Sequence, residues 1–555
     1  MVIALLGTGI FLTLRLGFLQ LRKLGHGFAV TSGVYDDPAE PGDVSHFQAL
    51  TTALSATVGI GNIAGVAIAI HWGGPGALFW MWMTALLGMA TKYSEVTLAQ
   101  HYRQVEKVDL DPHKWEGSVS GGPMYYIERG LGHSWKPLAV FFALMLGTTA
   151  FLTGNAIQAN TVADTMNTTF GIPVWVSGLV TSTVVALVII GGITRIGRVT
   201  SILAPLMATI YVIGALIIIG LSYDRLIPTF GLIVREAFNP TAGVAGTGVG
   251  VFLLTMVWGV KRGLFSNEAG QGSAPIAHAA AKTDEPVSEG VVALVEPFID
   301  TIVICTMTGL VIILTGVWDN RVKTEITLSG GDISWVELEA NGNQNGIQAP
   351  LEIRIADGHY VDSAPGAPRL GWHEVAVEPL YSDPEQTALF TGVVYPDRQT
   401  AVADDGTTYQ ALYADAVESG APLTMLGFQA GLPGDLGRYI VVFSVLLFAI
   451  STAISWSYYG DRCANYLFGA KWIMPYKVVF VLMHFGGAVV SLAVAWTLGD
   501  LFLGIVIIPN LLALILLSPK VVELTKSYFE RKPWIENREV QRRLREERRL
   551  RRKAN

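Results

Sequence analysis

The stretch LSATVGIGNIAG, residues 54–65, decides the fold, together with its counterpart WGVKRGLFSNEAGQG, residues 258–272. Each lies within an apolar run comparable to the roughly 20 residues that cross a bilayer. A helix in lipid must satisfy its own backbone, so an unwound segment at membrane depth is tolerated only where it is buried or lines a cavity. The two stretches therefore predict two interrupted helices. The glycines in question are Gly59, Gly61 and Gly65 in the first, and Gly259, Gly263, Gly270 and Gly272 in the second.

The composition around these stretches is typical of a membrane protein. Of the 555 residues, 51% are apolar and only 15% are charged, a balance unlike that of a soluble domain. Long apolar runs separated by short polar breaks predict an all-α polytopic protein with eleven transmembrane helices. We place them near residues 2–19, 46–70, 77–99, 137–159, 173–191, 201–221, 247–280, 289–316, 436–465, 474–497 and 500–518.

Basic residues set the expected orientation, because they remain cytoplasmic. The loop from Arg103 to Lys136 is basic, Arg195 and Arg198 flank a short turn, and arginines cluster in the tail, residues 519–555. All three fall on one side of the eleven-helix arrangement. We therefore expect a multi-pass protein of the bacterial inner (plasma) membrane, with its N-terminus outside and its basic C-terminal tail in the cytoplasm against anionic lipid. The first run lacks the leader of a secretory signal, so we expect a retained helix.

Residues 317–424 interrupt the apolar pattern. They are rich in turns, and from residue 319 to 418 they carry 17 acidic and 5 basic residues. Period-two alternation with Asn-Gly and Asp-Gly turns predicts a small β-rich insertion, and the expected topology places it outside the cell. A solubilising cap and a gating or partner-binding role are both open for this segment.

The two predicted breaks stand five spans apart, which is the pattern of an inverted-repeat transporter. Spans 2–6 (44–222) would form one half and spans 7–11 (244–316 and 434–518) the other, with the helix at 1–20 outside the repeat. Freed amides favour a carboxylate and freed carbonyls attract cations, so the meeting point of the breaks suits an amino acid zwitterion. Close helix packing would also account for the glycines, but it does not account for the polar residues beside them, Asn62, Ser266, Asn267 and Glu268.

Four stretches of the chain resemble the alanine or glycine:cation symporter family: ALSATVGIGNIAGVAIAIHWGGPGALFWMWMTALLGMATKYSE (53–95), GGPMYYIERGLG (121–132), GNAIQAN (154–160) and GLFSNEAGQGSAPIAHAAAKTDEP (263–286). The resemblance covers the chain from about Ser45 to Pro286, and the second half fits in its pattern of spans. It implies a leucine-transporter-like 5+5 inverted repeat formed by spans 2–11, with one extra N-terminal helix. It also implies symport of a small neutral amino acid, alanine or glycine, with sodium.

The motif TVGIGN, residues 57–62, is also similar to the unwound first core helix of neurotransmitter:sodium symporters. By that resemblance, the carbonyl of Thr57 faces the substrate ammonium group and the amides of Ile60 and Gly61 face its carboxylate. Asn62 would lie near a cation.

The motif FAISTAISW, residues 448–456, resembles the helix that supplies hydroxyl groups to the sodium site of this fold. The resemblance implies that Ser451 and Thr452 are sodium ligands, completed by the carbonyls of Ser55 and Val58. Sodium is a hard cation, and neutral oxygens suit it. Without the resemblance, the ordinary interpretation of such hydroxyls is that they bond to carbonyls of their own helix.

Three further side chains are candidate substrate contacts. The amide of Gln158 would hold one end of the zwitterion, or join two helices. Asn267 would bind substrate, or satisfy the unwound backbone beside it. Trp258 would form a pocket wall or gate, or simply pack between helices.

Charged groups inside spans are costly and so point to function. Glu268, beside the second break, and Asp300, in the eighth span, are candidate gating or coupling residues. Glu296 lies nearer the cytoplasmic end, where we expect a solvated or salt-bridged gate residue. Lys92 and Glu95 are expected to form a structural pair.

The expected function is secondary active transport by alternating access, with Na⁺ as the coupling ion and no organic cofactor. No nucleophile–base set or nucleotide motif indicates an enzyme or a primary pump. The expected partners are a small neutral amino acid and membrane lipid, without nucleic acid, and a monomer is compatible with the sequence. Two alternatives stay open: a proton-coupled amino-acid transporter, and a sensor or receptor that uses this scaffold with the external domain.

Overall fold

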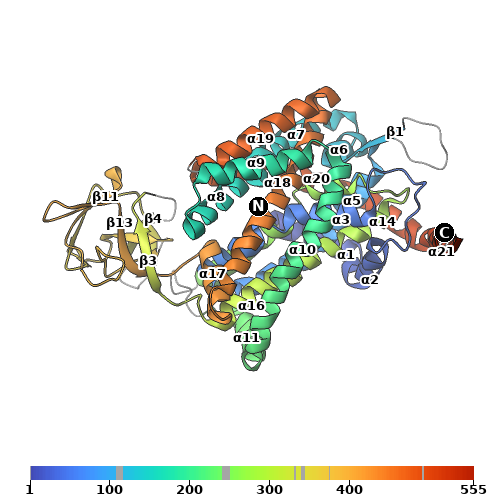
Figure 1. Ribbon diagram of the computed structural model, residues 1–555. Helices are drawn as coiled ribbons and strands as arrows, with labels where there is room; N and C mark the ends of the chain where they lie inside the picture. Colours follow the sequence, from blue (N-terminus) through green and yellow to red (C-terminus); the bar gives the residue numbers. More distant parts are fainter. Residues whose placement is uncertain are drawn as a thin grey trace.

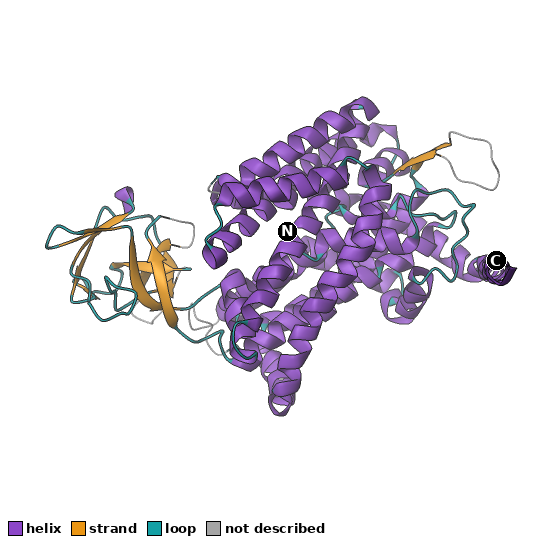
Figure 2. Cartoon of the chain, in the orientation of Figure 1, coloured by secondary structure: helices purple, strands orange, loops and turns teal. Residues whose placement is uncertain are grey.

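The computed structural model describes residues 2–107, 117–240, 250–329, 333–338, 344–373, 375–490 and 493–554. A bundle of long helices makes up most of the molecule, and a small β domain projects from one end of it (Figure 1, Figure 2). The C-terminal helix lies at the opposite end (Figure 1). Residues 247–249 of the predicted seventh span and residues 108–116 of the predicted basic loop lie outside the described residues.

The helices follow one another through most of the chain. Those of the first half are α1 (Val2–Arg15), α2 (Leu19–Thr31), α3 (His46–Thr57), α4 (Val66–Gly73), α5 (Ala77–His101), α6 (Pro123–Gly130), α7 (Lys136–Phe151), α8 (Ile157–Phe170), α9 (Val174–Ile189), α10 (Gly192–Leu221) and α11 (Tyr223–Phe238). Those of the second half are α12 (Gly250–Asn267), α13 (Ala274–His278), α14 (Pro286–Ala293), α15 (Val295–Pro297), α16 (Thr306–Thr315), α17 (Gly420–Gly431), α18 (Leu436–Phe468), α19 (Ile473–Val489), α20 (Ala493–Arg531) and α21 (Trp534–Ala554). Wider π-helical turns join some of them, at Gly61–Gly65, Leu152–Ala156 and Phe298–Cys305.

The lengths and composition of these helices are those of a multi-pass membrane protein. Six helical segments of the described chain are long and apolar enough to cross a bilayer, and two bent pairs raise the number to eight. The predicted spans that this count leaves out are 77–99, 173–191 and 247–280. They correspond to α5, to the 16-residue α9 and to the interrupted pair α12 and α13.

The first predicted break is present in the second span. Ser45 caps α3 with a reciprocal capping box to Gln48, and α3 ends at Thr57. Val58 then leaves the helical conformation, with φ −74° and ψ 88°, and the helix resumes through the π-helical turn into α4. The two halves are bent by 55°.

The second predicted break is also present, but it begins later than the glycine pattern indicates. α12 runs through Gly259 and Gly263 and ends at Asn267. Glu268, Gly270 and Gly272 then take left-handed backbone conformations, with φ 54°, 89° and 78°, and α13 follows. The two earlier glycines serve packing instead: a Cβ at Gly259 would lie 2.4 Å from the carbonyl oxygen of Ala77 on α5.

The first span and two connecting helices differ from the expectation. The predicted helix 2–19 ends at Arg15, where the left-handed residues Gly17 and Phe18 turn the chain into α2. The bend between α1 and α2 is 81°. The sequence did not lead us to expect α11 or α17, which lie together with α16 near the β-domain end of the bundle (Figure 1).

The predicted β-rich insertion forms small antiparallel sheets. Its strands are β3 (Val322–Thr327), β4 (Ile333–Leu338), β5 (Gln344–Gly346), β6 (Ile353–Ala356), β7 (His359–Tyr360), β8 (Pro368–Trp372), β9 (Val375–Ala376), β10 (Gly392–Tyr395), β11 (Thr400–Ala403), β12 (Thr408–Tyr409) and β13 (Ala411–Ala416). The strand orders are β12-β11-β10-β6-β7, β5-β4-β8-β9 and β13-β3. Val322 pairs with Ala416, so the chain enters and leaves the domain at one place. A second hairpin, β1 (Gln104–Lys107) with β2 (Gly117–Ser120), belongs to the helical part.

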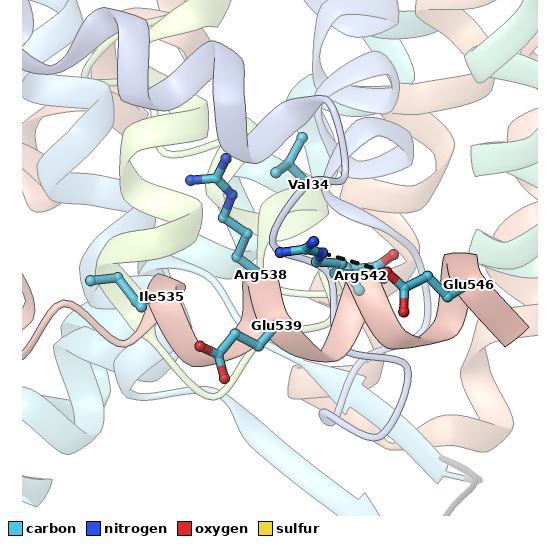
Figure 3. Close-up of a pocket in the computed structure, with 7 residues that line it drawn as sticks. Val34, Ile535, Arg538, Glu539, Arg542 and Glu546 are labelled. Atoms are coloured by element: carbon cyan, nitrogen blue, oxygen red, sulfur yellow. Dashed lines mark ion pairs between the residues drawn. The ribbon is translucent and has the colours of Figure 1, made fainter.

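The C-terminal tail docks at the other end of the bundle. Arg531 donates two hydrogen bonds to the carboxylate of Glu285, at 2.7 and 2.9 Å, and Asn537 donates to Glu40 at 3.1 Å. A cleft remains between α21 and the loop that carries Val34 (Figure 3). Its lining includes Arg542 and Glu546, which pair with one another at 3.5 Å.

Candidate functional site

The two breaks meet at a small cavity in the interior of the bundle. It offers about 20 Å³ to the centres of water-sized molecules, which is room for about one water. Six of the predicted binding, sodium and coupling residues line it: Thr57, Ile60, Gly61, Gln158, Glu268 and Thr452. The other lining residues are Ala56, Gly59, Thr153, Phe265, Gln271, Trp456 and Leu503.

Several polar atoms at this cavity have no hydrogen-bond partner among the described residues. They are the side-chain carbonyl oxygens of Gln158 and Gln271 and the hydroxyl of Thr153. The amide nitrogen of Gln158 is already committed, because it donates to the carbonyl of Thr153 at 3.1 Å. Buried polar groups are nearly always satisfied. These unpaired acceptors are therefore suited to hold a ligand that carries N–H donors.

Glu268 contributes a carboxylate to the lining of the cavity. The indole N–H of Trp456 donates to its carboxylate at 3.1 Å, and the hydroxyl of Ser273 donates to the other oxygen. Both donors are neutral. Trp456 also packs tightly against the π-helical turn of the fourth span, since a Cβ at Gly154 would lie 2.3 Å from its ring.

The predicted sodium ligands lie against the first break. The Ser451 hydroxyl lies 3.3 Å from the carbonyl oxygen of Ser55, and the Thr452 hydroxyl lies 3.1 Å from the same atom. The Thr452 hydroxyl is also 3.3 Å from the carbonyl of Ala56. Ser451 donates within its own helix as well, to Phe448 at 2.9 Å. Val58, whose carbonyl is a further predicted ligand, is the buried residue directly after the end of α3.

A second polar cluster lies behind the cavity, around Asp300 in the π-helical turn Phe298–Cys305. Asn62 donates to one oxygen of the Asp300 carboxylate at 2.7 Å, and Ser266 and Thr301 donate to the other at 2.7 Å each. Asn62 also accepts a hydrogen bond from the amide of Gly59 in the first break, at 2.9 Å. All of these side chains are fully buried. The cluster thus connects the first break and the last turn of α12 to one buried carboxylate, whose hydrogen-bond partners here are neutral.

Two predicted substrate contacts lie elsewhere. The ring of Trp258 stacks on Trp72 with centroids 5.6 Å apart, and the ammonium nitrogen of Lys261 lies 5.0 Å from the Trp258 centroid. The side chain of Asn267 accepts a hydrogen bond from the amide of Ala269, at 3.0 Å, and so satisfies the unwound backbone. Neither Trp258 nor Asn267 is among the residues that line the cavity.

The expected pairing of Lys92 with Glu95 is not the one that forms. Lys92 donates to Glu296 at 3.0 Å. Glu95 instead accepts from the side chain of Asn510 at 2.5 Å and from the amide of Gly272 at 3.1 Å. Glu296 lies on α15, which follows α14 along the chain and packs against α5 as α14 does, and this brings Glu296 within reach of Lys92.

Four polar or aromatic lining residues were not anticipated from the sequence: Trp456, Thr153, Phe265 and Gln271. Three of them carried a usable signal. Trp456 follows Thr452 by four positions, so both face the same side of α18, and Phe265 and Gln271 lie in the second glycine-rich stretch. Thr153 shares the π-helical turn that precedes Gln158, a feature that residue spacing does not predict.

Comparisons with known proteins identify relatives over most of the chain. A model of the sodium:alanine symporter family matches residues 1–334 and 400–542. The sodium/alanine symporter AgcS of Methanococcus maripaludis is 40% identical over 532 residues, 96% of this chain and 94% of the relative. A Bacillus subtilis protein named as a sodium/proton-dependent alanine carrier is 31% identical over 95% of this chain and 89% of its own length. A second Bacillus subtilis protein, named as a sodium/glutamine symporter, is 30% identical over 96% of this chain and 88% of its own length.

These matches confirm the resemblance that the motifs around residues 53–95 and 263–286 indicated. The internal stretch that the family model leaves unmatched, 335–399, falls within the β domain. The chain is a membrane transporter rather than an enzyme, and it belongs to the sodium:alanine symporter family of sodium-coupled amino-acid symporters.

Proposed function

We propose that this protein carries a small neutral amino acid, alanine or glycine, together with Na⁺ by alternating access. The observation that supports this most strongly is the cavity between the two breaks, where unpaired acceptors of Gln158 and Gln271 adjoin the hydroxyl of Thr452. Broken helices that meet at a buried polar chamber are the usual binding site of inverted-repeat transporters.

We further propose eleven spans, with spans 2–11 as a 5+5 inverted repeat in the bacterial plasma membrane. In this arrangement the N-terminus is outside and the C-terminus is cytoplasmic. The β domain and the basic tail occupy opposite ends of the molecule (Figure 1), which suits an external domain and a cytoplasmic tail.

The substrate would be held by its two charged ends. Its ammonium group would face the carbonyls of Thr57 and Gln158, and its carboxylate the amides of Ile60 and Gly61. Trp456 and Phe265 form the neighbouring walls and leave little space for a side chain. A cavity of about 20 Å³ must widen even for alanine. This conformation therefore corresponds to a closed state, from which the cavity opens to one side of the membrane or the other.

Sodium would bind where backbone and hydroxyl oxygens already converge. The hydroxyls of Ser451 and Thr452 lie 3.3 and 3.1 Å from the carbonyl oxygen of Ser55, and oxygens of this kind are the ligands that hard cations take. The carbonyl of Val58 would complete the set. Asn62 and Asp300 offer a second place for a cation, because a fully buried carboxylate with neutral partners is costly unless it is protonated or paired with one.

Uptake into proteoliposomes tests this proposal. Labelled alanine is expected to accumulate only with an inward sodium gradient, and unlabelled glycine should compete more strongly than glutamine. Equal accumulation with potassium alone would refute sodium coupling. If glutamine competed more strongly than glycine, the preferred substrate would be a larger amino acid than proposed.

Proton coupling is the second candidate, and the neutral partners of Glu268 and Asp300 support it. A carboxylate in such a place is able to carry a proton in one state and lose it in another. Alanine uptake without sodium that acidifies the vesicle lumen would favour this mechanism. A lumen that keeps its pH during sodium-driven uptake would exclude it.

Removal of the β domain separates a carrier from a receptor. Because Val322 pairs with Ala416, a short Gly/Ser linker can replace residues 322–416 without moving α16 or α17. Sodium-driven alanine uptake is expected to persist, since the cavity residues lie outside this segment.

The matched control for this deletion is His373→Ala. The imidazole of His373 lies against that of His71 near the end of α4, with ring centroids 6.1 Å apart, so this substitution removes a side-chain contact between the domain and the helices and keeps the rest of the domain. A deletion variant that folds but no longer transports alanine would contradict the expectation and favour a role for the domain in gating or reception.

A further inference from the structure

The segment that leads into α3 and the segment that follows α13 are joined to one another. The segment before α3 runs beside the segment after α13, with Val44 and Ala281 as partners in a parallel bridge. Asp43 donates its amide hydrogen to Ala280 at 2.8 Å, and Lys282 donates to Val44 at 2.8 Å. These main-chain bonds hold together the start of α3 and the end of α13, which are the ends that lie away from the two breaks.

The side chain of Arg103 strengthens this junction. It donates to the carbonyls of Ala279 and Ala281 at 2.9 and 2.8 Å, and to the carbonyl of Pro41 at 3.0 Å. One guanidinium thus spans both segments.

A single buried carboxylate also bridges the two half-helices themselves. One oxygen of Glu289, on α14, bonds to Nδ1 of His46, the first residue of α3. Its other oxygen lies 2.5 Å from Nδ1 of His278, the last residue of α13. All three side chains are buried, with exposed fractions of 0–1%.

The bridge continues inward through charged groups. Nε2 of His278 lies 3.4 Å from Glu296, which in turn accepts from Lys92. Nε2 of His46 lies 4.0 Å from Asp36. Each imidazole thus forms a hydrogen bond to Glu289 through Nδ1 and lies at ion-pair distance from a second carboxylate through Nε2. Two carboxylates around one imidazole favour its positively charged form, and hydrogen bonds between charged groups are the strong ones.

The junction lies at the end of the molecule that carries the basic tail. Arg531 binds Glu285, three residues after Lys282, and Asn537 binds Glu40, three residues before Asp43. Figure 3 places α21 directly beside the loop of Val34, which precedes this segment. With the proposed orientation, the junction faces the cytoplasm.

We propose that Glu289, with His46 and His278, is the lock of the cytoplasmic gate, and that these contacts must part before cargo leaves the central cavity toward the cell interior. This inference rests on the proposed alternating-access function. Glu289 is a positioning residue, because it lies outside the proposed substrate and sodium sites. It holds α3 and α13, the cytoplasmic halves of the two broken helices, against one another.

The first test joins the segments covalently with Val44→Cys and Ala281→Cys. Adjacent strands lie about 4.8 Å apart, within the reach of a disulfide. Oxidation is expected to abolish alanine uptake and leave sodium-dependent alanine binding in detergent intact, and reduction should restore uptake. Mass spectrometry would verify the cross-link. A cross-linked protein that transports alanine as fast as the same protein with its disulfide reduced would overturn the proposal.

The second test opens the lock with Glu289→Gln. Ala274 is fully buried and lies between Gln271 of the cavity and His278 of the lock, so Ala274→Cys reports access from the cytoplasmic side. In inside-out vesicles a membrane-impermeant maleimide is expected to label it about tenfold faster when Glu289 is Gln, which corresponds to the loss of one charged contact.

The matched control is Glu285→Gln, which removes a carboxylate from the same junction without touching either histidine. An equal labelling rate in all three backgrounds would overturn the lock. Uptake by the unsubstituted protein tests the symport proposal separately from the lock. Sodium-independent alanine uptake would refute symport at any labelling rate, whereas equal labelling rates with sodium-dependent uptake would refute the lock alone.

Discussion

Replacing Asp300 with Asn is expected to raise the sodium concentration for half-maximal alanine uptake by at least about tenfold, equivalent to about 1.4 kcal/mol. Asn62, Ser266 and Thr301 supply the hydrogen bonds to this carboxylate, and none of them carries a charge. A cation nearby would gain most of its electrostatic stabilisation from Asp300. The amide is the same shape as the protonated acid, so the fold should survive the change. Uptake at varied sodium concentration measures the effect.

Asp461→Asn is the matched control for Asp300. Asp461 is equally buried, but Arg462 and Lys477 already compensate its charge, at 2.8 and 3.3 Å. Its loss is expected to lower thermal stability, because it leaves the buried Lys477 and the partly buried Arg462 without this carboxylate, and to leave the sodium dependence unchanged. An Asp300→Asn protein with the parent's sodium dependence would show that the coupling ion is held without this carboxylate.

Replacing Gln158 with Leu is expected to raise the KM for alanine about 10- to 100-fold. The unpaired carbonyl oxygen of Gln158 faces the cavity, and a hydrogen bond to a charged ligand group is worth about 1.5–3 kcal/mol. Leucine keeps the approximate volume and removes the acceptor. Initial uptake rates over a range of alanine concentrations measure the effect.

Asn160→Leu provides the comparison on the same helix. Asn160 donates to the carbonyl of Val490 at 3.2 Å and is not a lining residue of the cavity. Its KM for alanine is expected to remain close to that of the parent. A Gln158→Leu protein with the parent's KM would remove this side chain from the substrate site.

The sequence predicted the existence of both breaks, because glycines and polar residues gathered in the middle of an apolar run favour an unwound backbone. It did not predict where the second break begins. Gly259 and Gly263 have the same residue type as Gly270 and Gly272, yet the first pair accommodates α5 and the second pair supplies the positive φ angles. Only the packing of the neighbouring helix distinguishes these two uses.

The same division holds for the site. The motif TVGIGN spans the short break between α3 and the π-helical turn, so Thr57, Ile60 and Gly61 reach the cavity together. Trp258 and Asn267 lie close to the second break in sequence, but the direction of each side chain depends on helical phase and on local backbone bonds. Asn267 turns to satisfy Ala269. Glu289 bonds to His46, which lies 243 positions away in the chain, a contact that no local pattern indicates.

The proposed mechanism depends on one chamber, in which the freed backbone of two broken helices holds cargo and sodium together. Equilibrium binding of labelled alanine to the purified protein, with and without sodium, tests it most directly. We predict that sodium raises the affinity for alanine and that alanine raises the affinity for sodium by the same factor, as linkage requires. Alanine binding with one affinity in sodium and in potassium would contradict this mechanism.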